Sequence, residues 1–121
     1  MSLRALVLGS GGREHALAWA LASGGHEVIC APGNGGTAAL GRNLALEVTR
    51  PDGVVRAARD AAVDLVVIGP DSAVAAGVAD ACMAADIPVF GPTAAAGRIE
   101  WSKRFAKELM REAGIPTPCS V

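Results

Sequence analysis

The sequence predicts an α/β fold with a doubly wound, mostly parallel sheet. Four short apolar runs lack polar alternation, which is typical of strands covered on both faces, and helical stretches separate these runs. Strands that alternate with helices are joined by right-handed crossovers into an open parallel sheet. The strands are expected over residues 5–8, 28–31, 65–68 and 88–90, with a weaker fifth strand over 44–48.

The stretches between the strands have helical periodicity. The first is apolar almost all round, as expected of a helix pressed against a sheet. Asp52 is placed to cap the second helix, and Ser102 is placed to cap the last one, which is amphipathic. The helices are expected over residues 14–22, 53–62, 74–85 and 103–113.

The composition excludes several classes of protein. The chain has 121 residues and is 51% hydrophobic, which is enough to bury a core in one domain. Its net charge is −1 and it has no Tyr, so it offers neither a basic patch nor a stacking platform for nucleic acid. No apolar run approaches the roughly 18 uncharged residues that span a membrane. Three widely spaced cysteines (Cys30, Cys82 and Cys119) fit reduced thiols, so we expect a cytoplasmic protein.

Each strand is followed by a loop of Gly or Pro with small polar or acidic residues. These loops read "GSGG", "APGNGG", "GPDS" and "GPT". In open α/β sheets the ligand crevice lies at the carboxyl ends of the strands, so the four loops are expected to converge on one binding edge.

The first glycine turn fits a single anion better than a dinucleotide or a nucleoside triphosphate. The dinucleotide fingerprint G-x-G-x-x-G is matched at Gly9 and Gly11, but Glu14 stands at the third glycine. The end of the second strand also lacks the acidic residue that binds ribose, and a Walker A lysine is missing. What remains is a nest of backbone N–H groups with Arg13 beside it, fit for one phosphate or carboxylate. Alternatively, Gly11 and Gly12 serve only to make a tight turn.

The neighbouring residues leave further alternatives open. His15 lies in the first turn of a helix, where a capping or packing role is favoured over acid–base chemistry. Asn34 and Thr37 fit either hydrogen bonding to a sugar phosphate or an Asn-Gly turn with Thr37 as a cap. Asp71 fits either the binding of ribose hydroxyls or the capping of the next helix. Two distant histidines and scattered carboxylates have no ligand spacing, so no metal site is predicted.

Four segments together resemble the N-terminal domain of the glycinamide ribonucleotide synthetase (phosphoribosylamine–glycine ligase) family. They are "VLGSGGREHALAW", "APGNGGT", "VVIGPDSAVAAGVAD" and "VFGPTAAAGRIEWSKRFAKELMREAGIPTP", in the family's order and spacing. The resemblance covers essentially the whole chain and implies a Rossmann-like, pre-ATP-grasp domain. It implies a substrate-binding domain over residues 1–98. Residues 99–121 would be a helix and the start of a linker into an ATP-grasp domain.

The resemblance also implies a reaction and its partners. The complete family enzyme uses ATP and Mg²⁺ to join glycine to 5-phosphoribosylamine in de novo purine biosynthesis, giving glycinamide ribonucleotide, ADP and phosphate. ATP and Mg²⁺ would be bound mainly by the ATP-grasp domain that follows, so this chain is expected to be inactive alone and to carry no catalytic residue. Lys103 is similar to the lysine through which such enzymes reach ATP phosphates. The phosphoribosylamine site would comprise Gly11, Gly12, Arg13, Asn34, Gly36, Thr37, Gly69, Pro70 and Asp71.

Two residues depart from the family pattern, and other functions remain alternatives. Asp71 stands where the family usually has Glu, and Trp101 stands where it usually has Gly. The alternatives are a stand-alone dinucleotide-binding module, the equivalent domain of another ATP-grasp enzyme such as a biotin-dependent carboxylase, and a pure interaction domain.

Overall fold

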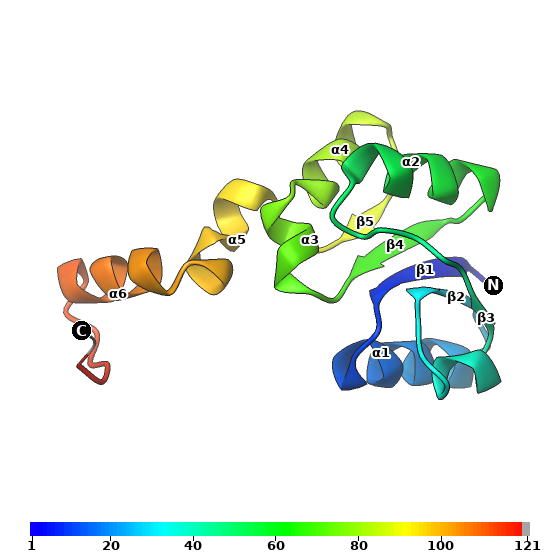
Figure 1. The fold of residues 1–121 in the computed structure, drawn as a ribbon, viewed down its shortest axis with the longest axis horizontal. Helices are drawn as coiled ribbons and strands as arrows, with labels where there is room; N and C mark the ends of the chain where they lie inside the picture. Colours follow the sequence, from blue (N-terminus) through cyan, green and yellow to red (C-terminus); the bar gives the residue numbers. More distant parts are fainter. Residues whose placement is uncertain (120–121) are drawn as a thin grey trace.

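The fold is a five-stranded, fully parallel sheet with helices on both faces (Figure 1). A computed structural model describes residues 1–119. The strand order is β3-β2-β1-β4-β5, and every neighbouring pair is parallel. The strands are β1 (Arg4–Gly9), β2 (Glu27–Pro32), β3 (Arg42–Asn43), β4 (Leu65–Ile68) and β5 (Val89–Phe90). The predicted doubly wound sheet is therefore confirmed.

Helices cover the two faces unequally. One face is covered by α1 (Gly12–Ser23) and the short 3₁₀ helix η1 (Thr37–Ala39), and the other by α2, α3 and α4. Side chains alternate along the strands, so that Leu6 and Leu8 of β1 pack toward α2–α4 while Val7 packs toward α1. These helices are α2 (Pro51–Asp60), α3 (Asp71–Ala75) and α4 (Val78–Ala84).

Two further helices project from the sheet and its layers. α5 (Ala94–Trp101) contacts α3, and α6 (Lys103–Glu112) packs on α5 and extends away from the sheet (Figure 1). Ser102 separates them in an extended conformation and caps α6, because its Oγ accepts a hydrogen bond from Phe105 N at 3.3 Å. The predicted cap at Ser102 is confirmed. The proposed division after residue 98 falls inside α5 and stays a prediction.

The structure corrects several expected elements. The weak fifth strand lies at Arg42–Asn43 and not over 44–48. Asp52 does not cap α2, because that helix begins at Pro51 and its N-cap is Arg50. The helix expected over 74–85 is two helices, because Gly77 adopts a left-handed φ of +84° that breaks the hydrogen-bond ladder. The helix α5 was not predicted.

Cys30 and Cys82 are buried within the core, as expected, and Cys119 is exposed. Among residues 1–119, none of the helices combines the length and the apolar character that crossing a membrane requires.

Candidate ligand-binding crevice

The strand order reverses between β1 and β4. The chain proceeds from β1 to β2 and β3 on one side, then returns to add β4 and β5 on the other. In such sheets the ligand crevice opens at the carboxyl ends of the two strands that flank the reversal. Here those ends carry the turn from Gly9 to Gly12 and the loop from Gly69 to Asp71. The two ends are joined by a backbone hydrogen bond from Gly69 N to Leu8 O at 3.2 Å.

The first turn leads directly into α1. Gly9 has a φ of +120°, which a residue with a side chain rarely adopts, and α1 begins at Gly12. The Glu14 carboxylate caps the helix, since its Oε2 accepts a hydrogen bond from Gly11 N at 2.7 Å. Within the described chain, the N–H groups of Gly12 and Arg13 have no partner and lie at the positive end of α1. The predicted nest thus loses the N–H group of Gly11 to Glu14, while those of Gly12 and Arg13 stay free.

Arg13 bridges the reversal point. Its Nη1 donates to Gly69 O at 2.6 Å and lies 3.7 Å from Asp71 Oδ1. The two side chains are 62% and 47% exposed, so this ion pair contributes little to stability. Asp71 is the first residue of α3 and Pro70 is its N-cap, so Asp71 does not cap the helix. The structure therefore brings Arg13, Gly69, Pro70 and Asp71 together, with a cation and an anion at the crevice.

Glu14 is the important residue that the sequence patterns did not assign. It is only 6% exposed, although it carries a carboxyl group. A Cβ atom added at Gly9, Gly11 or Gly69 would collide with its side chain. The glycines of both loops therefore make room for Glu14. The available signal was a single carboxylate in the first turn of a helix that is apolar from Ala16 to Ala22.

The second loop is tied to the first by Asn34. Its Nδ2 donates to Ser10 O at 2.9 Å, while its Oδ1 accepts from Gly36 N at 2.8 Å and Thr37 N at 3.0 Å. The N-cap of η1 is Gly36 and Thr37 is its first residue, so the expectation that Thr37 caps the helix is wrong, while Asn34 closes the turn before it. Both ends of the Asn34 amide are engaged, so this side chain holds two loops in register.

Thr37 is buried inside the second loop. It is 1% exposed, and its hydroxyl accepts from Asn34 N and donates to Asn43 Oδ1, both at 2.8 Å. Burial raises the pKa of the neighbouring Cys30 thiol, and a hydrogen bond with Thr37 opposes that rise. We therefore expect Thr37 to shape the loop. Asn43 also holds this loop, because its Nδ2 donates to Asn34 O at 2.9 Å, and no sequence pattern predicted this contact.

His15 follows the predicted packing role. A Cβ atom on Gly36 would lie 2.7 Å from His15 Nδ1 and nearer still to Cε1. The imidazole ring of α1 therefore lies directly against the backbone of the second loop.

An apolar cavity adjoins the Arg13–Asp71 pair. It has a volume of about 330 Å³, and its walls come from α1, β4, β5, α3 and α5. Trp101 forms part of it and is held by a hydrogen bond from its Nε1 to Ala94 O at 3.2 Å. The apolar lining residues are Leu17, Ile68, Val74, Phe90, Pro92 and Trp101, and the charged ones are Arg13, Asp71 and Glu100.

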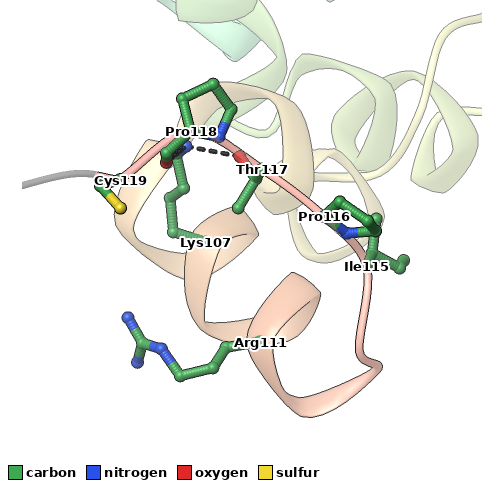
Figure 2. Close-up of a pocket in the computed structure, with 7 residues that line it drawn as sticks. All are labelled: Lys107, Arg111, Ile115, Pro116, Thr117, Pro118 and Cys119. Atoms are coloured by element: carbon green, nitrogen blue, oxygen red, sulfur yellow. Dashed lines mark hydrogen bonds between the residues drawn. The ribbon is translucent and has the colours of Figure 1, made fainter.

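Lys103 is not at the crevice. It begins α6 and is exposed, and Figure 1 shows α6 extending away from the sheet. A separate hollow lies between α6 and residues 115–119, where Lys107 Nζ donates to Thr117 Oγ1 and Pro118 O (Figure 2). The ammonium group of Lys107 is thus already hydrogen-bonded to acceptors of the chain itself. In residues 1–119 no three His, Cys, Asp or Glu side chains are grouped to hold a metal ion.

The fold is that of a doubly wound α/β domain whose loops converge at the reversal of strand order. The chain belongs to the family described as phosphoribosylglycinamide synthetase, N domain, which matches residues 3–100. The resemblance found in the sequence is therefore confirmed.

Relatives of the chain are longer enzymes. The chain is 48% identical over 119 residues to the phosphoribosylamine–glycine ligase of Xylella fastidiosa, covering 95% of this chain and 28% of the relative. It is 44% identical to the trifunctional purine biosynthetic protein adenosine-3 of Homo sapiens, covering 97% of this chain and 12% of that protein. The chain thus spans less than a third of either relative.

Solved structures agree with these relatives. The crystal structure of the Thermotoga maritima phosphoribosylamine–glycine ligase matches with a TM-score of 0.65 and 35% identity, covering 97% of this chain and 26% of that one. The biotin carboxylase domain of a single-chain bacterial carboxylase matches with a TM-score of 0.72 at 17% identity, covering 98% of this chain and 30% of that one. The second match shows a shared fold alone.

Proposed function

We propose that this chain is the phosphoribosylamine-binding part of a phosphoribosylamine–glycine ligase of purine biosynthesis. The observation that carries the proposal is the Arg13 bridge across the reversal point, in a chain of this family. The complete enzyme would join glycine to 5-phosphoribosylamine and convert ATP to ADP and phosphate. The cytoplasmic location expected from the sequence belongs to the same proposal.

The crevice supplies groups suited to a sugar phosphate. The free N–H groups of Gly12 and Arg13 and the positive end of α1 favour a phosphate. The guanidinium of Arg13 forms stronger, bidentate hydrogen bonds with a phosphate than with a half-exposed carboxylate 3.7 Å away. On binding, Arg13 would therefore turn from Asp71 to the phosphate. The released Asp71 carboxylate would accept hydrogen bonds from ribose hydroxyls, which is the role expected of the usual Glu.

ATP and Mg²⁺ belong to the same proposal. In the longer family enzymes they would be bound mainly by the ATP-grasp domain. Lys103, which is exposed at the start of α6, would reach the ATP phosphates from this chain. The chain alone is expected to show no glycine-dependent ATP turnover.

Titration of the 121-residue chain with ribose 5-phosphate, followed by two-dimensional NMR, tests the proposal. We expect saturable shifts in the loops at Gly12 and Gly69, and weakening by about tenfold or more in Arg13→Ala, because hydrogen bonds to charged groups are lost. Arg56→Ala is the matched control, because Arg56 is an exposed arginine of α2. Unchanged binding in Arg13→Ala would contradict the proposal. Saturable NADH binding without sugar-phosphate binding would instead favour a dinucleotide module.

A further inference from the structure

His15 lies beside the groups proposed to bind the phosphate, but it has no role in the function proposed above. Its ring contacts the second loop at Gly36, where a Cβ atom would lie 2.7 Å from Nδ1 and 2.8 Å from Nε2. No hydrogen bond to either ring nitrogen is found within residues 1–119. The contact is therefore steric packing of the ring against the backbone of a residue that has no side chain.

Gly36 is required here for space and not for its conformation. Its φ of −74° and ψ of −41° are ordinary helical values that any residue adopts. A methyl group on Gly35, directly before it, would meet no atom within 4 Å, so the crowding is specific to the residue that faces His15. A methyl group at Gly36 would have to displace either the ring or the loop.

The contact continues into the crevice through Asn34. Gly36 N donates to Asn34 Oδ1 at 2.8 Å, and Asn34 Nδ2 donates to Ser10 O at 2.9 Å. Ser10 immediately precedes the Gly11–Arg13 turn. Displacing Gly36 therefore moves the side chain that ties the second loop to the phosphate turn.

We propose that His15 is a positioning residue whose ring sets the separation between the second loop and the first turn of α1. The ring thereby keeps the Asn34–Ser10 hydrogen bond formed and the crevice loops in register. The link to ligand affinity rests on the proposed function, whereas the link to loop position does not.

A double-mutant cycle on the free energy of unfolding tests the contact. We expect Gly36→Ala to increase the unfolding equilibrium constant by about tenfold or more, because overpacking is costly. In the His15→Ala background, Gly36→Ala should increase the unfolding equilibrium constant by less than about threefold, because the ring is gone. Gly35→Ala is the matched control and should have little effect in either background. Equal costs of Gly36→Ala in both backgrounds would overturn the inference.

Two further readouts separate positioning from simple stabilisation. In folded His15→Ala, the Asn34 side-chain amide should shift in the NMR spectrum and exchange faster, and the dissociation constant for ribose 5-phosphate should rise by about tenfold. His15→Phe, which keeps a ring without nitrogen atoms, should restore most of the Asn34 amide signal and most of the affinity for ribose 5-phosphate. An unchanged Asn34 amide in His15→Ala would overturn the inference. Failure of the unmodified chain to bind ribose 5-phosphate would overturn the proposed function. The double-mutant cycle and the NMR signal of the Asn34 amide would still test whether His15 positions the loop.

Discussion

Replacing Glu14 by alanine removes the only buried carboxylate within residues 1–119. The side chain accepts a hydrogen bond from Gly11 N at 2.7 Å and fills the space between the ends of β1 and β4. The hydrogen bond to a charged acceptor contributes about 1.5–3 kcal/mol. The carboxylate at the positive end of α1 adds about 0.3–1 kcal/mol. We therefore expect Glu14→Ala to lose about 2–4 kcal/mol of the free energy of unfolding.

Urea unfolding followed by circular dichroism measures this loss, and thermal unfolding should show Tm falling by roughly 10 °C for a domain of this size. Glu112→Ala is the matched control, because Glu112 is exposed at the end of α6, and it should stay within about 0.5 kcal/mol. Glu14→Gln keeps the shape and an acceptor oxygen but not the charge, so an intermediate loss is expected. A loss in Glu14→Ala no larger than that of the control would refute the reasoning.

Two other expectations concern the crevice and the thiols. Asp71→Asn should weaken the binding of ribose 5-phosphate but not of inorganic phosphate, because it replaces a charged carboxylate, a strong acceptor for ribose hydroxyls, by a neutral amide with one acceptor oxygen, and it frees Arg13. Parallel NMR titrations measure the two affinities, and equal weakening of both would contradict this expectation. Iodoacetamide at about pH 8 should modify Cys119 alone in the folded chain, because burial raises the pKa of the Cys30 and Cys82 thiols and blocks access to them. Mass spectrometry should then count one adduct in buffer and three in urea, and rapid modification of a second thiol in buffer would contradict the packing.

The sheet could be predicted because its signal is local. The four uninterrupted apolar runs lie on the observed strands, and their loops meet at one edge because parallel strands share a direction. The fifth strand could not be placed. Leu44, Leu46 and Val48 alternate and pack against the core from one side, but the ladder with β2 is formed by exposed Arg42 and Asn43. The alternation of apolar residues over 44–48 therefore indicated that one side of an extended segment is buried. It did not indicate that this segment pairs with a neighbouring strand.

The convergence of the candidate loops could be predicted, but the contacts that hold these loops together could not. Gly11 and Arg13 follow β1, while Gly69 and Asp71 follow β4, so the topology of a parallel sheet places them at one edge. Glu14 fills the space between the ends of β1 and β4, and the size of that space cannot be read from spacing along the chain. In the sequence, Glu14 stood out as a mismatch to a dinucleotide fingerprint and as a lone carboxylate at the start of an apolar helix.

Three successive residues of α1 explain why the loops of this crevice belong together. Successive helical residues point about 100° apart, so Arg13, Glu14 and His15 leave the first turn in three directions. Arg13 reaches the carbonyl of Gly69, Glu14 lies beneath that same glycine, and His15 lies against Gly36. Glu14 and His15 fit only because the facing residues have no side chain. One helical turn therefore contacts the loops after both β2 and β4, so the packing of α1 sets the positions of these loops relative to its own N–H groups.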